Sequence, residues 1–134
     1  MYLLDANVCI RFMNGTSAGV IKNLKRRSAK RIVMCSVVKA ELLYGARHSQ
    51  QVEKNLLRVR EFLKTFQSLY FDDACAEEYS QIKSELSRQG NLIGPNDLLI
   101  ASIALAHDAI LVTNNTREFS RVRNLRLEDW QADE

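Results

Sequence analysis

The sequence has little of what holds small secreted proteins together or takes a chain into a membrane. Among its 134 residues are only three cysteines, which lie far apart and form no Cys-x-x-Cys pair. This pattern predicts neither a disulfide framework nor a zinc site. No apolar run approaches about 18 residues, and no charged segment precedes an apolar one at the N-terminus, so we expect neither a transmembrane helix nor a signal peptide. A protein of the reducing cytoplasm fits these absences.

Histidine and proline are also scarce. The two histidines, His48 and His107, stand apart from the other polar groups, and we expect each at the surface or at a helix end. There is no internal repeat, low-complexity segment or linker, and the contents of 46% apolar and 26% charged residues are ordinary for a globular protein. We therefore predict a single domain over residues 1–134.

Positive charge is modest overall but unevenly distributed. The formal net charge is +3, which permits contact with nucleic acid without indicating it. Six Lys or Arg residues lie within residues 22–31, and four Arg residues lie within 117–126. Each group fits either a solvated surface or a contact with phosphate.

Short apolar segments predict buried strands, and amphipathic segments between them predict helices. The expected strands cover residues 2–4, 32–35, 69–71 and 109–112, with an edge strand at 125–127. The expected helices cover residues 7–12, 37–47, 51–66, 74–89 and 97–105, with shorter turns around 20–24 and 117–122. Because strands and helices alternate, we predict an α/β fold with three layers, α/β/α, around a central parallel sheet of four to five strands.

Three carboxylates fall at equivalent places in this predicted sheet. Asp5 follows the first strand, Glu41 lies in the helix after the second, and Asp97 opens the helix before the fourth. Ligand sites of such sheets form beyond the carboxyl ends of the strands, so these groups would meet at one edge. Taken alone, Glu41 also fits a surface ion pair and Asp97 a helix N-cap. Asp5 ends a wholly apolar strand and is the hardest to explain without a partner.

Three carboxylates in one pocket repel each other, and a divalent cation removes that conflict. No histidine or cysteine joins the set, and ligands that are all oxygen favour Mg²⁺ or Mn²⁺ over zinc. The polar segment 113–115 follows the fourth strand and would lie at the same edge.

Several motifs together resemble those of the PIN-domain ribonucleases, and within them the VapC toxins of bacterial toxin–antitoxin modules. The resemblance covers nearly the whole chain in order, although no single motif is decisive. The matching segments are Leu3–Asn7, Ser36–Gly45, Gly94–Ala101, Val112–Phe119 and Leu127–Trp130.

The resemblance implies a PIN-like domain and an endoribonuclease that uses Mg²⁺, or Mn²⁺, to hydrolyse RNA phosphodiester bonds and so inhibit translation. It implies that Asp5, Glu41 and Asp97 hold the metal. It also implies a cognate VapB-type antitoxin, a homodimer, and transfer RNA, including the initiator, as substrate.

On this basis we expect four residues to form the catalytic group, and others to support them. The catalytic group is Asp5, Glu41, Asp97 and Asn115. The residues expected to orient it by hydrogen bonds are Asn7, Ser36 and Thr113. The residues expected to bind RNA are Arg117, Lys25 and Arg26.

Two positions depart from the commonest family pattern. Ala6 stands where many relatives carry Thr, and Asn115 stands where many PIN domains carry a fourth Asp. One branch of VapC toxins shares the second change. A neutral Asn115 leaves three negative charges in the cluster, from which we expect one firmly held metal and a second arriving with the substrate phosphate.

Other readings remain open. A receiver domain would have a pair of acids after the first strand, and a haloacid-dehalogenase-like phosphatase would have a second Asp at Asn7. A catalytically silent PIN domain that only binds RNA or a protein is the main alternative, and Asn115 leaves it open.

Overall fold

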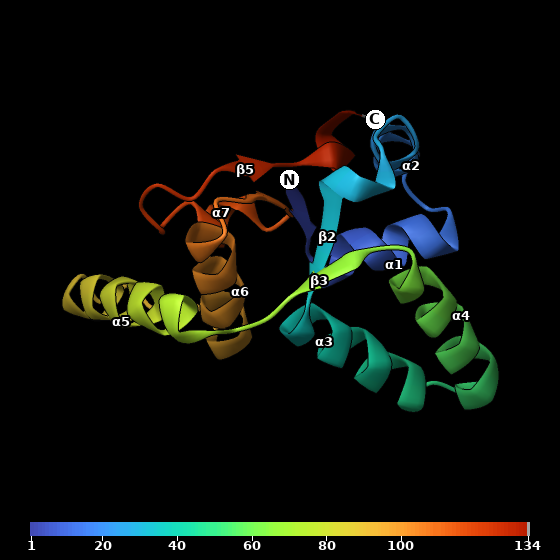
Figure 1. Ribbon diagram of the computed structural model, residues 1–134, viewed down its shortest axis with the longest axis horizontal. Helices are drawn as coiled ribbons and strands as arrows, with labels where there is room; N and C mark the ends of the chain where they lie inside the picture. The colour runs from blue at the N-terminus through green and yellow to red at the C-terminus, as the bar shows by residue number, and fades with distance from the viewer. Residues whose placement is uncertain (134) are drawn as a thin grey trace.

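A computed structural model describes residues 1–133, in which a five-stranded parallel sheet lies between helices (Figure 1). The strand order is β3-β2-β1-β4-β5, and every neighbouring pair is parallel. The strands are β1 (Tyr2–Leu4), β2 (Ile32–Cys35), β3 (Gln67–Leu69), β4 (Ile110–Val112) and β5 (Leu127–Glu128). The predicted fold class is confirmed, with five strands.

Helices cover both faces of the sheet. In Figure 1, α1 to α4 lie on one side and α5 to α7 on the other. The helices are α1 (Ala6–Asn14), α2 (Ala18–Lys25), α3 (Ser36–Arg47), α4 (Val52–Lys64), α5 (Asp73–Arg88), α6 (Pro95–Ala106) and α7 (Thr116–Phe119), with 3-10 turns η1 (Ala29–Arg31) and η2 (Trp130–Asp133). The strand order changes direction at β1, so the connections leave a site at the carboxyl ends of β1 and its neighbours.

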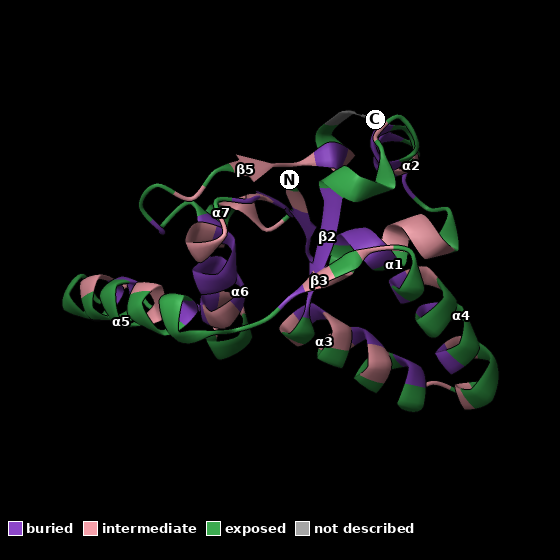
Figure 2. Cartoon of the chain, viewed as in Figure 1, coloured by how far each residue is buried: buried purple, intermediate pink, exposed green. Residues whose placement is uncertain are grey.

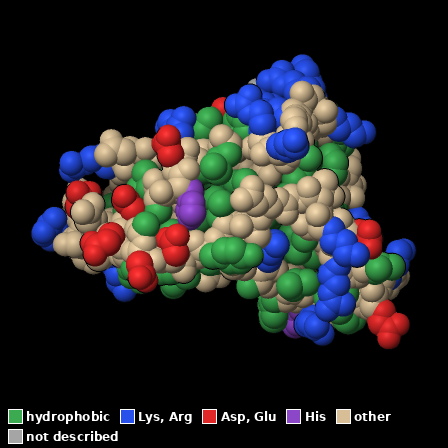
Figure 3. Space-filling view, in the orientation of Figure 1, with side chains coloured by type: hydrophobic (Ala, Val, Ile, Leu, Met, Phe, Trp, Pro, Cys, Tyr) green, Lys and Arg blue, Asp and Glu red, His purple; other side chains and the backbone are tan. Residues whose placement is uncertain are grey.

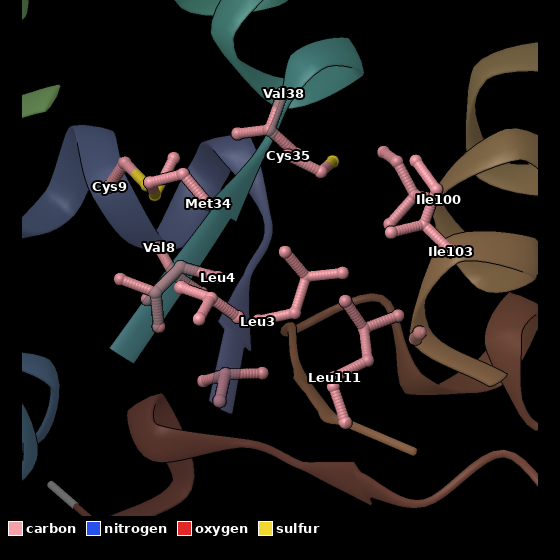
Figure 4. Packing of buried hydrophobic residues seen from close by; sticks show 14 of the residues in the cluster. Leu3, Leu4, Val8, Cys9, Met34, Cys35, Val38, Ile100, Ile103 and Leu111 are labelled. Carbon is pink, nitrogen blue, oxygen red and sulfur yellow. The ribbon is translucent and has the colours of Figure 1, made fainter. Parts of the chain in front are cut away.

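Strand β1 is the centre of the core. It pairs with β2 on one side and β4 on the other, and Leu3 and Leu4 are both fully buried. Successive side chains of a strand point to opposite faces. Figure 4 accordingly shows Leu3 toward Leu111 and Leu4 toward Val8 of α1. A strand fixed on both edges and both faces holds the next residue, Asp5, in a defined place.

Helix α6 is buried nearly all round, as its composition predicts. Ile100, Ala101, Ile103 and Ala104 are completely buried (Figure 2). Its one buried polar side chain, Ser102, donates from Oγ to the carbonyl oxygen of Leu98 at 2.7 Å. The packing fixes the end of α6 that carries Asp97. None of the described helices is both long and apolar enough to cross a membrane.

Several boundaries differ from the sequence prediction. Helix α1 begins at Ala6, one residue before the predicted start, and its N-cap is Asp5, whose Oδ1 atom accepts the Ala6 N–H at 2.9 Å. Helix α3 begins at Ser36, one residue before the predicted start. Helix α6 begins at Pro95, two residues before Asp97, which suits a residue that lacks an N–H.

Strand β3 also lies earlier than predicted. It covers Gln67–Leu69 and pairs with β2 through backbone groups. The more apolar Tyr70 and Phe71 follow it and are 68% and 38% exposed. Hydropathy indicated the wrong residues because an edge strand is held by its backbone ladder and needs few buried side chains.

Candidate active site

Asp5 lies at the carboxyl end of the central strand and is nearly fully buried. Its Oδ1 atom accepts the N–H of Ala6, and its Oδ2 atom accepts the hydroxyl of Thr113 at 2.8 Å. Thr113 is completely buried and follows β4 directly. The hydroxyl of Thr113 also accepts the Asn115 N–H at 3.0 Å. Thr113 therefore links Asp5 to the loop that carries Asn115, in keeping with its predicted role of orienting the catalytic group by hydrogen bonds.

Glu41 and Asp97 face the same edge of the sheet from α3 and α6. Glu41 lies in the second turn of α3, and it lines the same hollow as Asn96 of α6. Asp97 lies in the first turn of α6, where the positive end of the helix dipole favours a carboxylate. The charge of Asp5 raises the pKa of both Glu41 and Asp97, and the charge of Glu41 also raises that of Asp97, so the three acids form one electrostatic group.

A fourth carboxylate, Glu118, joins this group and was not among the predicted site residues. Its Oε1 atom accepts the backbone N–H of Gly94 at 2.8 Å, and its Oε2 atom accepts from Nδ2 of Asn115 at 2.9 Å. A Cβ on Gly94 would lie 3.7 Å from Oδ2 of Asp97 and 3.8 Å from Oε1 of Glu118. The two carboxylates therefore flank the same glycine, at the start of α6.

One feature of the sequence could have indicated that Glu118 belongs to the site. It follows Asn115 by three residues at the beginning of a short helix, a spacing that places both side chains on one face. The loop after β4 thus holds a neutral residue, Asn115, that positions a charged one. The acidic group thus contains four carboxylates, where the sequence predicted three.

Burial and mutual repulsion raise the pKa values of the three predicted acids. Burial is the largest cause for Asp5, and the hydrogen bond from Thr113 opposes it. Burial also raises the pKa of Glu41, with the charge of Asp5 second. Burial, followed by the charge of Glu118, raises the pKa of Asp97 to about 7. Hydrogen bonds from Gly94 and Asn115 lower the pKa of Glu118. At neutral pH, Asp97 shares the site with a carboxylate that stays ionised.

The donor set fits a divalent cation. The Oε1 atom of Glu41 is buried and has no hydrogen-bond partner among the described residues. Among the described residues, no Lys, Arg or His forms an ion pair with Asp5, Glu41 or Asp97. An unpaired, buried anionic group is costly, and a cation beside it removes the cost. The carboxylate oxygens of these three acids nevertheless do not all lie close to one another. Within residues 1–133, three ligand atoms come within 4.8 Å of one another only at Asp72, Cys75 and His107.

The remaining predicted residues lie at different distances from this group. Asn7 and Ser36 are exposed at the first turns of α1 and α3, and the described structure shows no side-chain hydrogen bond for either. Arg117 is exposed on α7, next to Glu118. Lys25 and Arg26 are exposed at the end of α2, which leads toward the amino end of β2 and so lies at the opposite edge of the sheet.

Hollows adjoin the acidic group. One of about 440 Å³ lies between α3 and α6, and another of about 260 Å³ lies among α1, α3 and α4. Glu41 lines both. The first also includes Ser36 and the 67% exposed ring of Tyr44. In Figure 3, Lys and Arg side chains gather over α2, and Asp and Glu side chains gather over α5.

Comparison with known proteins gives a consistent result. The family model described as PIN domain matches residues 2–125. The "tRNA(fMet)-specific endonuclease VapC" of Shigella flexneri is 42% identical over 129 residues, covering 96% of this chain and 97% of that protein. The "Ribonuclease VapC2" of Rickettsia felis is 40% identical and covers 97% and 98%.

Solved structures agree with these relatives. The toxin–antitoxin complex VapBC2 from Rickettsia felis, bound to a DNA fragment from its promoter, contains a chain with a TM-score of 0.88 at 39% identity, covering 96% of this chain and 98% of that chain. The DNA-bound VapBC complex of Salmonella typhimurium gives a TM-score of 0.89 at 34% identity and covers 96% and 97%.

Proposed function

Because this chain belongs to the PIN-domain family, we propose that it is a metal-dependent endoribonuclease and the toxin of a toxin–antitoxin pair. The observation that carries the proposal is the acidic group at the carboxyl edge of the sheet. Asp5, Glu41, Asp97 and Glu118 raise or lower one another's pKa values there, and among the described residues no Lys, Arg or His forms an ion pair with the first three. The relatives named as ribonucleases, with 40% identity or more over nearly the whole chain, supply the class of reaction.

The reaction is hydrolysis of an RNA phosphodiester bond. Asp5 and Asp97 would hold the cation directly, and Glu41, whose Oε1 atom has no hydrogen-bond partner among the described residues, would be the third ligand. The donors are all oxygen, which favours Mg²⁺, with Mn²⁺ as the alternative. When bound, the cation supplies positive charge against the phosphate and makes water at the site more acidic.

The protein's own groups prepare this site before substrate arrives. Thr113 fixes the Oδ2 atom of Asp5 by its hydroxyl, and the helix cap fixes Oδ1. Asn115 and the Gly94 N–H hold Glu118 beside Asp97, so the charge of Glu118 helps to raise the pKa of Asp97 and the two carboxylates can share one proton. Arg117, exposed beside Glu118, contacts the RNA phosphate. Asn7 and Ser36 orient water or substrate from the first turns of α1 and α3.

Transfer RNA, including the initiator, is the proposed substrate. The relative from Shigella flexneri is named for that specificity and shares 42% of its residues with this chain. The partner is a VapB-type antitoxin, because the similar solved structures are complexes of toxin and antitoxin. We propose a homodimer as the form that the antitoxin binds.

The silent PIN domain is the second candidate, and Glu118 argues against it. The absence of a fourth Asp at Asn115 was its support, yet Asn115 places a fourth carboxylate in the group. Receiver and phosphatase folds are not supported, since the family match covers residues 2–125.

The test uses initiator tRNA as the substrate, with purified chain and Mg²⁺. We expect a single cut, mapped by sequencing the RNA ends, which disappears with EDTA. Asp5→Asn should abolish it and keep the fold, because Asn also caps a helix well. Asp73→Asn, an exposed acid on α5, is the matched control and should cut normally. RNA binding without any cut in the unmodified chain would establish the silent alternative.

A further inference from the structure

A second group of metal-binding side chains lies where the start of α5 meets the end of α6. One ligand atom each from Asp72, Cys75 and His107 lies within 4.8 Å of the other two. Asp72 is the N-cap of α5, and its Oδ1 atom accepts the Cys75 N–H at 3.1 Å. His107 is the C-cap residue of α6. The two helices pack against each other, so the group joins segments that are distant in sequence.

One atom of this group lacks a partner. Nε2 of His107 is buried and makes no hydrogen bond within the described structure. Its nearest charged neighbour is the Oδ2 atom of Asp72 at 3.9 Å, which is too far for a hydrogen bond. A buried polar nitrogen without a partner is unfavourable. The position between Nε2 and Oδ2 is therefore one where a small cation would be stabilised.

Cys75 provides the third donor, from the buried side of the site. Cys75 is completely buried, and its Sγ atom donates a hydrogen bond to the carbonyl oxygen of Tyr70 at 3.6 Å. The side chain of Asp72 is 54% exposed, which leaves a side open to water. Sulfur and nitrogen thus approach from within and an oxygen from the rim, as in sites with three protein ligands and one water.

We propose that Asp72, Cys75 and His107 form a zinc site, with water as the fourth ligand. Two nitrogen or oxygen ligands of tetrahedral zinc lie roughly 3.3 Å apart, given bonds of about 2.0–2.1 Å. The observed 3.9 Å between Nε2 and Oδ2 reaches that value by a small rotation of the exposed Asp72 side chain. Zinc displaces the thiol proton of Cys75, which leaves to solvent, and bonds to the thiolate.

The ligand types separate this site from the acidic group. Thiolate and imidazole select zinc and related ions, whereas an all-oxygen set selects Mg²⁺. Asp97 and His107 lie at opposite ends of α6, about 15 Å apart at 1.5 Å per residue. The sequence pattern predicted no zinc site because its donors come from two segments, and only the packing of α5 on α6 brings them together.

The site would tie the first turn of α5 to the last turn of α6. A ligand that binds only the folded chain stabilises it in proportion to its concentration over the dissociation constant. Zinc should therefore raise the unfolding temperature of the full chain even with Mg²⁺ in excess. That readout alone would not identify the site, since zinc also binds carboxylates.

Cobalt identifies it directly, because Co²⁺ bound to a thiolate gives an intense charge-transfer absorption that oxygen ligands do not give. We would titrate the full chain with Co²⁺ in excess Mg²⁺. The expected result is this absorption, saturating at about one equivalent and lost on adding zinc. Its absence in the folded, unmodified chain would overturn the proposal.

Variants assign the ligands, and the chain offers a matched control for two of them. Cys75→Ser should remove the thiolate absorption entirely. Asp72→Asn keeps the helix cap and should weaken Co²⁺ binding at least about tenfold, while the neighbouring Asp73→Asn should not. His107→Gln should weaken it at least as much, while His48→Gln should not. Unchanged affinity in both Asp72→Asn and His107→Gln would overturn the site, even if Cys75→Ser failed to fold.

RNA cleavage separates this proposal from the proposed function. Asp72→Asn should cut initiator tRNA at the normal rate with Mg²⁺, because it leaves the acidic group intact. An inactive chain that still shows the thiolate absorption would refute the nuclease and leave the zinc site standing.

Discussion

The carboxyl and amino edges of the sheet differ in whether their charged side chains have partners within the protein. At the carboxyl edge, Asp5, Glu41 and Asp97 have no cationic partner among the described residues. At the amino edge, the guanidinium of Arg27 lies 4.6 Å from the ring centre of Tyr2 and 4.7 Å from that of Trp130. The carboxyl edge therefore leaves its negative charge without a cationic partner, whereas the positive charge of Arg27 at the amino edge contacts other parts of the fold.

The amino edge is a closed network. Arg27 donates from Nη1 to the carbonyl and side-chain oxygens of Asn23, both at 2.9 Å, and lies 3.8 Å from Glu128. Nε1 of Trp130 donates to Glu128 at 2.9 Å. These contacts join α2 to the last turn of the chain. Within the basic run of residues 22–31, Arg27 is therefore structural, whereas Lys25 and Arg26 remain exposed.

The largest expected effect is at the carboxyl edge. Asp97→Asn should lower the rate of RNA cleavage by at least about 100-fold, because it removes a proposed ligand of the cation. The same change should raise the free energy of unfolding of the metal-free chain by about 1 kcal/mol at pH 7.5, after discounting for solvent screening, because it removes repulsion from Glu118. Cleavage assays and urea denaturation in EDTA measure the two effects. A loss of both activity and stability would contradict this account of the edge.

The second largest effect is at the amino edge, where a substitution should change stability and leave activity unchanged. Arg27→Ala should lower the free energy of unfolding by about 2–3 kcal/mol, since it removes two cation–ring contacts and two hydrogen bonds. Cleavage by the folded fraction should not change. Arg27→Lys should recover about half of the loss, because ammonium keeps the charge without the planar stacking surface. Circular dichroism during urea denaturation is the measurement. Equal stabilities for Ala and native Arg would show that the network is incidental.

The third effect tests the residue that sequence did not reveal. Glu118→Gln should reduce kcat by about tenfold, since its amide would present a donor to the donor Nδ2 of Asn115 and disturb the loop beside Asp97. Loss of its charge should also lower the pKa of Asp97, for which Glu118 is the second cause after burial. The pH dependence of kcat reports that shift. Glu77→Gln, an exposed change on α5, is the control. An unchanged profile would remove Glu118 from the site.

The convergence of Asp5, Glu41 and Asp97 could be predicted because it depends on topology. Parallel strands place their carboxyl ends at one edge, and alternating strands and helices specify that arrangement. Glu118 could not be predicted in the same way, since its position depends on a short loop and on two hydrogen bonds from Gly94 and Asn115.

Other differences have a similar physical origin. Strand β3 was misplaced because backbone pairing with β2, which hydropathy does not reveal, sets its position. The group of Asp72, Cys75 and His107 depends wholly on how α5 packs on α6. Apolar periodicity thus predicts the layers, while loops, edge strands and contacts between helices require the folded structure.

The smallest expected effect is the dependence of stability on pH in the absence of metal. The pKa of Asp97 is about 7 in the folded chain, against an ordinary value of 3.8, so between these pH values the folded state holds a proton that the unfolded state has lost. Stability therefore falls as pH rises through this window. The raised pKa values of Asp5 and Glu41 act in the same direction. The lowered pKa of Glu118 acts oppositely, but only below its ordinary value of 4.5.

In EDTA, we expect the free energy of unfolding to be about 1 kcal/mol higher at pH 5.5 than at pH 8, allowing for screening of the partly exposed Asp97. Asp97→Asn should remove most of this slope, and Arg27→Ala should leave it intact while lowering the whole curve. Saturating Mg²⁺ should reverse the slope, because the cation binds the ionised carboxylates and stabilises the folded chain more as pH rises. If stability instead rose with pH in EDTA, the carboxyl edge would be satisfied without a cation, and the contrast between the two edges would fail.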